Sequence, residues 1–281
     1  MSAMPDAAPT KRRFHFISGL PRAGTTLLAA ILNQNPRFRA GMTSPVADIM
    51  GVVVAEASSK NDFAFDVTDE QRTAVLRGLV ENFYSVNTQA EAIFDMSRLW
   101  CSRMGLLSTL FPDVKVIACV RQLAWVLDSM ERLVLKQPVS VSKVFRYDTN
   151  TTVYSRIEAL TDPRGMVGFA YQATKEAFYS AYAHDHLLLL TYESLVRDPA
   201  AAMRAVYQFL GEPWFEHDFD NIEYSADEFD ARVGMPGLHV VRAKVEAVER
   251  PPVLPREVFG RFANEAFWAD PKNNVNDVKI V

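Results

Sequence analysis

The feature that most restricts the fold of this chain is a strand, a glycine-containing turn and a helix that follow one another directly near the N-terminus. Phe14–Ser18 is a short apolar run, Gly19–Gly24 contains glycine and proline, and Thr25–Asn33 carries apolar residues at helical spacing. A strand that leads through such a turn into a helix is the first part of a βαβ unit, whose strands are parallel. The segment therefore predicts an α/β fold built around a parallel sheet.

The remainder of the chain continues the alternation of strands and helices. The strand at 114–120 is apolar except for Lys115, which is typical of a strand buried on both faces of a sheet. Gly211 is expected to end a helix in the left-handed conformation. Further strands are expected at 92–95 and 186–191, and helices at 45–58, 69–90, 102–111, 122–136, 166–183, 199–210 and 255–267. This order predicts a three-layer α/β domain with a central parallel sheet flanked by helices.

The expected domain organisation is simple. Residues 13–281 are expected to form a single α/β domain, and residues 1–12, which contain two prolines among small side chains, a disordered tail. Residues 137–165 are expected to be irregular apart from a short helix at 151–160, and the pattern weakens again after residue 213.

Composition excludes several classes of protein. With 30 basic and 34 acidic residues the net charge is −4, so a nucleic-acid partner is not expected and an anionic ligand needs local positive charge. The chain has only two cysteines, which favours a reducing compartment. It contains neither the apolar core of a signal peptide nor an uncharged apolar run of about 18 residues. We therefore expect a cytoplasmic protein with no membrane span.

The turn after the first strand has the composition of an anion-binding loop. Its glycines allow successive N–H groups to converge, and the helix that follows adds partial positive charge. A nucleoside-triphosphate P-loop reads G-x-x-x-x-G-K-[ST], but here Thr25 replaces the lysine and the positive charge comes from Arg22. The alternative is a turn that merely joins strand to helix. The candidate binding residues are Gly19, Pro21, Arg22, Ala23, Gly24, Thr25 and Thr26.

Other candidate residues also follow predicted strands, where ligands of parallel sheets bind. Arg121 directly follows the strand at 114–120, and Ser129 lies about two turns into the next helix. A guanidinium at the strand end can bind a phosphate through two hydrogen bonds, and the serine can add a hydroxyl donor. The alternative is a surface arginine beside a helix-packing serine. Asp128 and Glu131 must then point away from the phosphate.

The turn sequence Gly-Leu-Pro-Arg-Ala-Gly-Thr-Thr-Leu-Leu at 19–28 resembles the 5′-phosphosulfate loop of sulfotransferases that use 3′-phosphoadenosine 5′-phosphosulfate (PAPS). It is most similar to the protein-tyrosine and bacterial branch, whose loop reads G-x-P-R-[SA]-G-[ST]-T-L. Arg121 and Ser129 resemble the family's 3′-phosphate element. Tyr192-Glu-Ser-Leu-Val-Arg-Asp-Pro199 and Phe209-Leu-Gly-Glu-Pro-Trp214 match a third family pattern, so the resemblance runs from about residue 14 to about residue 265.

This resemblance implies a P-loop-like domain that transfers a sulfuryl group from PAPS to a hydroxyl, or less readily an amine, by in-line displacement without a metal. In the tyrosine branch a glutamate acts as the base, but the matching stretch at 39–45 has no carboxylate, and Asp48 is the next one. Met96 stands where the branch has a lysine, and Arg98 and Arg103 are candidates to replace it. We therefore do not expect protein tyrosine to be the acceptor. The expected acceptor is a hydroxyl on a small molecule, glycan or peptide.

Five residues receive further roles on this basis. Arg22 is the candidate that stabilises the transferring group and the leaving 5′-phosphate. His239, in a segment of turn-forming residues, and Asp48 are the candidate bases. In the tyrosine branch the C-terminal region folds over the cofactor and supplies a basic residue, for which Arg250 is the nearest match, at the 5′-phosphate. Tyr192 is expected to border the cofactor.

Two other functions stay open from the sequence. A P-loop kinase or nucleotide hydrolase would need a lysine at position 25 and a metal-binding carboxylate after a strand, which Asp95 could supply. A sulfotransferase-like protein that binds nucleotide but catalyses poorly would account for Met96 and the absent glutamate. A homodimer is also considered. The segments 43–68 and 137–165 are expected to border the acceptor, but they match no interpretable pattern.

Overall fold

The computed structural model describes residues 12–58, 66–86, 89–137, 139, 141–145, 148–149 and 151–281. The expected N-terminal tail lies outside the described residues except for Arg12, as do parts of the two segments expected to border the acceptor.

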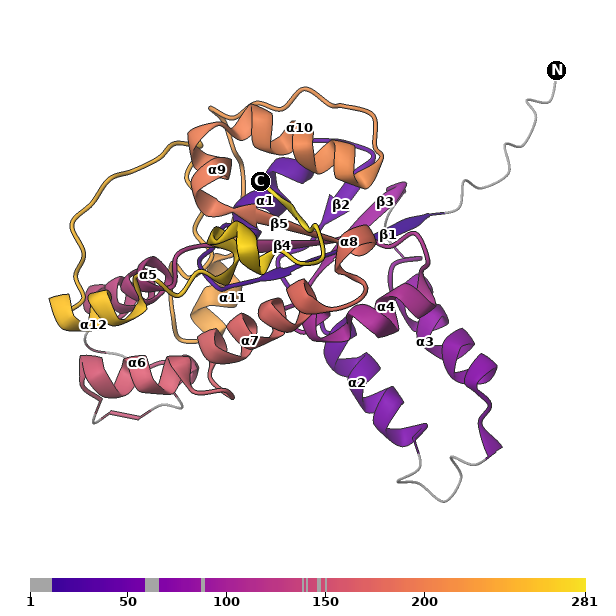
Figure 1. Cartoon of the computed structure of the whole chain (residues 1–281), viewed down its shortest axis with the longest axis horizontal. Helices are drawn as coiled ribbons and strands as arrows, with labels where there is room; N and C mark the ends of the chain where they lie inside the picture. The colour runs from indigo at the N-terminus through magenta and orange to yellow at the C-terminus, as the bar shows by residue number, and fades with distance from the viewer. Residues whose placement is uncertain are drawn as a thin grey trace.

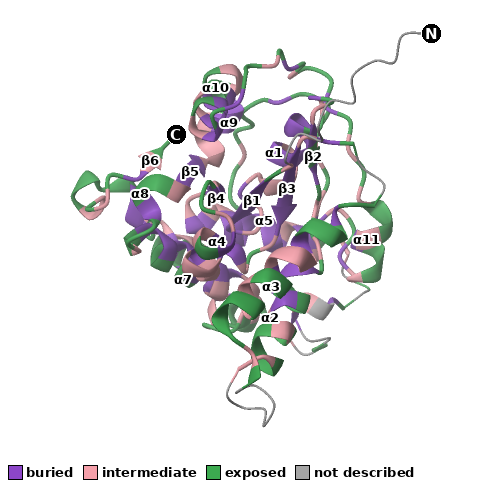
Figure 2. Cartoon of the chain, turned by 90° about the vertical axis from the view of Figure 1, so that its right-hand side faces the viewer, coloured by how far each residue is buried: buried purple, intermediate pink, exposed green. Residues whose placement is uncertain are grey.

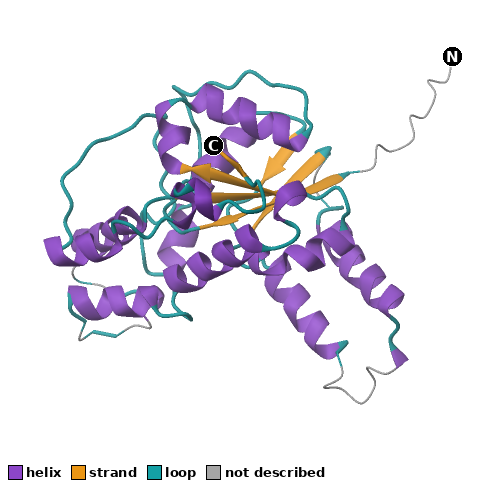
Figure 3. Ribbon diagram, viewed as in Figure 1, coloured by secondary structure: helices purple, strands orange, loops and turns teal. Residues whose placement is uncertain are grey.

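The described chain forms a six-stranded sheet in the order β2-β3-β1-β4-β5-β6, in which every neighbouring pair is parallel. Figure 3 shows these strands at the centre of the molecule, with helices around them. The strands are β1 (Arg13–Gly19), β2 (Phe38–Ala40), β3 (Ala92–Met96), β4 (Val116–Val120), β5 (Leu187–Thr191) and β6 (Lys279–Ile280). The prediction of an α/β fold with a central parallel sheet is confirmed.

Helices cover both faces of this sheet. Figures 1 and 2 show α1, α9 and α10 on one side and α4 and α7 on the other. The pair α2 and α3 projects from the second side, and its outer surface is largely exposed (Figure 2). The helices are α1 (Thr25–Leu32), α2 (Val46–Glu56), α3 (Asp69–Phe83), α4 (Met104–Leu110), α5 (Leu123–Lys136), α6 (Val153–Thr161), α7 (Met166–Tyr179), α8 (Ala183–His186), α9 (Tyr192–Arg197), α10 (Pro199–Leu210), α11 (Asp227–Arg232) and α12 (Arg256–Phe262).

Several segments differ from the sequence prediction. The helix expected at 69–90 ends at Phe83, and the one expected at 166–183 is interrupted at Ser180. Strands β2 and β6 and helix α9 were not predicted, because two to six residues are too few to show a period. Gly211 has φ 69° and ends α10 in the left-handed conformation, as predicted.

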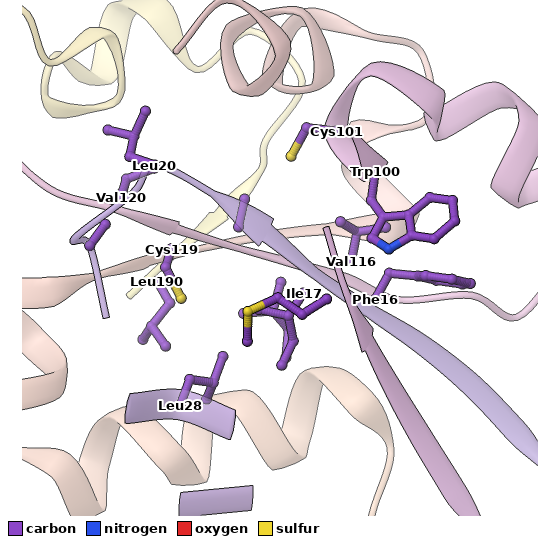
Figure 4. Close-up of a cluster of buried hydrophobic side chains, with 14 of the residues drawn as sticks. Phe16, Ile17, Leu20, Leu28, Trp100, Cys101, Val116, Cys119, Val120 and Leu190 are labelled. Atoms are coloured by element: carbon purple, nitrogen blue, oxygen red, sulfur yellow. The ribbon is translucent and has the colours of Figure 1, made fainter. Parts of the chain in front are cut away.

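The core is densest where β1 lies between β3 and β4. Phe16 and Ile17 in β1 are fully buried, and the Phe16 ring packs edge-on against Trp100 at 4.7 Å between centroids (Figure 4). From β1 the chain builds the sheet first toward β2 and β3 and then on the other side toward β4 and β5. This reversal makes the carboxyl ends of β1 and β4 the point where an open parallel sheet binds its ligands. Among the described residues, no helix is long and apolar enough to span a membrane.

His15 in β1 predicts a specific pH dependence of stability. Both ring nitrogens are buried without a hydrogen-bond partner among the described residues, and burial, with Arg13 and Lys115 nearby, lowers the pKa of His15 from 6.5 to about 3. The unfolded chain therefore takes up this proton first, and the free energy of unfolding falls as the pH drops below 6.5. When the pH falls from 7 to 5, we expect the free energy of unfolding of His15→Leu to decrease by about 2 kcal/mol less than that of the wild type.

Urea unfolding at both pH values measures this difference. His184, which is exposed, supplies the control His184→Gln, which should keep the wild-type dependence. An equal loss in His15→Leu and in the wild type would contradict the assignment of a neutral buried imidazole.

Candidate active site

A cavity of about 1140 Å³ opens at the carboxyl ends of the central strands. Its walls come from the turn after β1, the loop after β3, helix α5, the α6–α7 connection and the segment between α11 and α12. It brings together most of the residues selected from the sequence, namely Gly19, Pro21, Arg22, Gly24, Thr25, Thr26, Asp48, Arg121, Ser129, Tyr192, His239 and Arg250. Ala23 lies in the same turn but is buried, with 1% of its surface exposed.

The turn between β1 and α1 owes its shape to two glycines with positive φ. Gly19 has φ 110°, and a Cβ atom there would lie 2.1 Å from the Cys119 carbonyl oxygen. Leu20 N–H donates to that same oxygen at 2.9 Å, so the close approach of β1 to β4 requires Gly19. Gly24 has φ 95° and precedes the first residue of α1. Gly19 thus serves the packing of the strands as well as the course of the loop.

The start of α1 presents unpaired N–H groups to the cavity. Among the described residues, the amides of Thr25 and Thr26 have no protein acceptor, and no side chain caps the helix. The first N–H groups of a helix carry partial positive charge and bind anions such as phosphate. The turn therefore has the geometry expected of an anion site.

The Arg22 guanidinium lies beside this helix start and contacts two other segments. Its Nε donates to Ser129 Oγ at 3.0 Å, and its Nη1 donates to the carbonyls of Gly237, at 3.4 Å, and Leu238. Burial and the nearby charge of Arg121 lower the pKa of Arg22 to about 10, so it stays a cation at neutral pH. Ser129, which the sequence places with Arg121, is hydrogen-bonded to Arg22 in the structure.

Arg121 occupies the end of β4 as predicted. Its guanidinium lies over the Tyr192 ring at 4.1 Å from the centroid, and its Nη1 donates to the Arg22 carbonyl at 3.4 Å. Its buried Nε has no hydrogen-bond partner in the described part of the chain, although Glu193 lies 3.9 Å away. The Tyr192 ring also packs at Gly24, where a Cβ would lie 3.2 Å from it. Tyr192 therefore supports both Arg121 and the loop.

Arg250 reaches the cavity from the C-terminal segment and is held against α5. Its Nη2 lies 3.4 Å from Asp128 Oδ2, which is also 3.0 Å from Arg132 Nε. Asp128 Oδ1 accepts the Val253 N–H at 2.5 Å and that of Leu254 at 3.4 Å. The fully buried Asp128 carboxylate therefore anchors the segment that carries Arg250. Glu131, the other acid of concern, is paired with Arg156.

His239 forms a pair with a carboxylate that the sequence analysis missed. Its Nδ1 lies 2.5 Å from Asp230 Oδ1, and its backbone N–H donates to Asp230 Oδ2 at 2.9 Å. The Asp230 side chain is 1% exposed and the His239 side chain 21%. The only sequence signal for Asp230 is one acid among several in 227–230, which resembles an exposed helix start.

The remaining candidates come from α2, from β3 and from the segment after β3. Asp48 is exposed on α2 at the cavity wall, and Met96, the last residue of β3, and Arg98 line the same cavity. Arg103 donates instead to the Ala47 carbonyl. Asp95 accepts hydrogen bonds from Ser44, Tyr84 and Trp100. It is buried and committed to these donors. In the described part of the chain, no group of three or more metal-binding side chains is present.

Comparison with known proteins identifies the group to which these features belong. The model of the sulfotransferase family matches residues 15–216. Protein-tyrosine sulfotransferase A of Caenorhabditis elegans is 24% identical over 249 residues, covering 80% of this chain and 60% of that protein. Protein-tyrosine sulfotransferase 1 of Danio rerio is 25% identical over 242 residues, covering 84% and 62%. The chain thus spans about three fifths of the length of these relatives.

The fold is also found among solved structures. The sulfotransferase domain from the curacin biosynthetic pathway aligns with a TM-score of 0.53 at 16% identity, over 90% of this chain and 97% of that domain. At this identity the likeness concerns the arrangement of strands and helices.

The anchoring role of Asp128 can be measured. Asp128→Ala leaves Arg132, Arg250 and two backbone N–H groups without their shared acceptor in a buried place. We expect the free energy of unfolding to fall by about 3–5 kcal/mol, as for breaking a buried ion pair. Chemical denaturation provides the measurement, and the exposed Asp113 provides the control Asp113→Ala. Equal effects of the two substitutions would show that Asp128 anchors nothing.

Proposed function

The chain belongs to the sulfotransferase family, and on that premise we propose that it transfers the sulfuryl group of PAPS to a hydroxyl acceptor. One observation carries the proposal: among the described residues, the Arg22 guanidinium hydrogen-bonds only neutral oxygen atoms, beside the free N–H groups at the start of α1. A partly buried cation that hydrogen-bonds no carboxylate, next to N–H groups without an acceptor, favours the binding of an anion. The hydroxyl of Thr25 stands where an ATP site has its lysine.

The donor nucleotide has two phosphate positions in this proposal. The N–H groups and hydroxyls of Thr25 and Thr26 hold the 5′-phosphosulfate, with Arg22 beside them. Arg121, whose Nε lacks a hydrogen-bond partner among the described residues, binds the 3′-phosphate. Ser129 accepts a hydrogen bond from Arg22, which leaves its own O–H free to donate to a phosphate oxygen. Arg250, which is held against α5 by Asp128, adds a further positive charge at the 5′-phosphate.

The transfer itself needs one bond to form and one to break. The acceptor oxygen bonds to sulfur as the bond from sulfur to the 5′-phosphate oxygen breaks, and Arg22 balances the charge that develops on the leaving group. The acceptor proton passes to His239 Nε2, because Nδ1 is bonded to Asp230. Asp48 is the second candidate base, and its exposed place on α2 favours it less.

The acceptor is proposed from the residues that line the rest of the cavity. Beyond the donor region the cavity is bordered by Met96, Leu99, Met166 and Phe169, with Arg98 as the cation nearest to the position of the family lysine. A hydroxyl on a small molecule, glycan or peptide fits this mixed wall. A kinase or hydrolase is disfavoured because Asp95 is buried among three hydrogen-bond donors.

Nucleotide titration tests the donor assignment. Without magnesium the protein should bind 3′,5′-adenosine diphosphate, and Arg121→Ala should weaken that binding by about 1.5–3 kcal/mol, the scale of hydrogen bonds to a charged group. The affinity of Arg121→Ala for adenosine 5′-phosphate should differ little from that of the wild type. Arg197→Ala, an exposed arginine on α9, is the matched control. Magnesium-dependent binding of ATP, with no binding of 3′,5′-adenosine diphosphate, would contradict the proposal. Equal losses of affinity for the two adenosine nucleotides in Arg121→Ala would refute the role of Arg121.

Single-turnover transfer from PAPS to a simple phenol or alcohol tests Arg22. Because its charge is needed most as the leaving group develops, Arg22→Ala should lower kcat by about a hundredfold or more. Affinity for 3′,5′-adenosine diphosphate should fall less, since the amides of α1 still hold the 5′-phosphate. Arg22→Lys should restore only part of the rate, because an ammonium lacks the planar fork. Transfer at the wild-type rate by Arg22→Ala would leave Arg22 a structural residue.

A further inference from the structure

A single buried carboxylate fixes both the ring and the backbone of His239. Asp230 lies in α11. Its Oδ1 lies 2.5 Å from Nδ1 of His239, and its Oδ2 accepts the backbone N–H of His239 at 2.9 Å. The Phe229 ring packs edge-on against the imidazole at 5.4 Å between centroids. Nothing else in the described chain hydrogen-bonds the imidazole. The ring is therefore held from one side, and Nε2 is left for the cavity that His239 lines.

The chemistry of these partners determines where the imidazole proton sits. A neutral imidazole has one N–H donor and one acceptor nitrogen, and an ionised carboxylate only accepts. Because Asp230 faces Nδ1, that nitrogen must carry the hydrogen, so Nε2 keeps the lone pair that can take a proton. In water the choice between the two nitrogens is not imposed in this way.

The same short segment is also held by the cation of the donor site. Arg22 Nη1 contacts the carbonyls of Gly237 and Leu238, the two residues before His239. The N–H of Met235 donates to the Asp230 carbonyl at 3.0 Å, which closes the turn between the helix and the histidine. Arg22 and Asp230 thus fix neighbouring parts of one turn, and the base is placed relative to the residue that stabilises the leaving group.

We propose that Asp230 is a positioning residue that holds His239 with its hydrogen on Nδ1 and its Nε2 toward the cavity, ready to take the proton of the acceptor hydroxyl. This proposal rests on the proposed function for the role of His239 as base. The hydrogen position itself follows from the contacts between the two side chains and can be tested separately.

The substitution Asp230→Asn distinguishes positioning from a purely structural role. Its amide oxygen can still accept the backbone N–H of His239, so the hydrogen bond between side chain 230 and the His239 backbone is kept. Its NH2 group can then face Nδ1 as a donor, which moves the imidazole hydrogen to Nε2. A nitrogen that already carries a hydrogen cannot take the acceptor proton. Glu228→Gln, on the exposed face of the same helix, is the matched control.

The first measurement is the imidazole tautomer in the full chain. Long-range proton–nitrogen NMR of protein labelled with ¹⁵N-histidine reports which ring nitrogen is protonated, at about pH 8.5, above the ordinary histidine pKa of about 6.5. His239→Gln identifies the signal among those of the 5 histidines. We expect the hydrogen on Nδ1 in the wild type and in Glu228→Gln, and on Nε2 in Asp230→Asn. An unchanged tautomer in Asp230→Asn overturns the proposal.

The second measurement is single-turnover transfer. Asp230→Asn should lower kcat by roughly a hundred- to ten-thousandfold, toward the effect of the same exchange in a serine-protease triad. The affinity for 3′,5′-adenosine diphosphate should stay within about twofold of that of the wild type. The double variant Asp230→Asn with His239→Ala should transfer the sulfuryl group no more slowly than His239→Ala alone, because the effects of residues that act as a unit are not additive. If the tautomer reverses but kcat does not change, the positioning role is overturned. If the wild type transfers no sulfuryl group while the tautomer still reverses, the proposed function fails and the tautomer assignment stands.

Discussion

The Arg22 guanidinium joins three segments that lie far apart in the sequence. It extends from the turn after β1, meets Ser129 on α5 and reaches the carbonyls of Gly237 and Leu238. All of these acceptors are neutral, whereas the buried acids Asp128 and Glu131 each have arginine partners. A partly buried cation held only by neutral oxygens, with Arg121 close enough to lower its pKa, is a local excess of positive charge in a chain of net charge −4. An anion in the cavity would relieve that excess, so the net negative charge of the chain does not argue against the nucleotide site proposed above.

The backbone places this charge by a steric constraint rather than by electrostatics. At Gly19 the chain leaves β1 so close to β4 that any side chain would collide with the Cys119 carbonyl. The same approach puts Arg121, at the end of β4, within hydrogen-bonding distance of the Arg22 carbonyl. The two arginines are therefore brought together by strand pairing, and their mutual repulsion is offset by the Tyr192 ring and by the fold as a whole.

The parts of the site that follow strands could be predicted from the sequence, because a local pattern specifies them. The loop around Arg22 and the strand end at Arg121 are examples: apolar runs give the strands, and parallel strands end at one edge. The pairing of Arg22 with Ser129 and the contact of Asp230 with His239 could not be predicted, because a local pattern does not specify which side chains of separate segments meet. Strands β2 and β6 escaped prediction for a related reason, since their pairing depends on neighbours distant in the chain.

The C-terminal segment shows how an irregular chain can still place side chains accurately. Between α11 and α12 it forms no regular element (Figure 1), and most of residues 240–249 are exposed. Buried carboxylates fix it at each end, Asp230 at residue 239 and Asp128 at residues 253 and 254. Backbone hydrogen bonds from Ile222 to Ala243 and from Val245 to Phe219 hold the middle. Charged hydrogen bonds of this kind fix direction as well as distance, whereas apolar contacts allow sliding. A segment that must carry His239 and Arg250 into the cavity, without a helix or strand to guide it, is therefore better held by buried acids than by apolar packing.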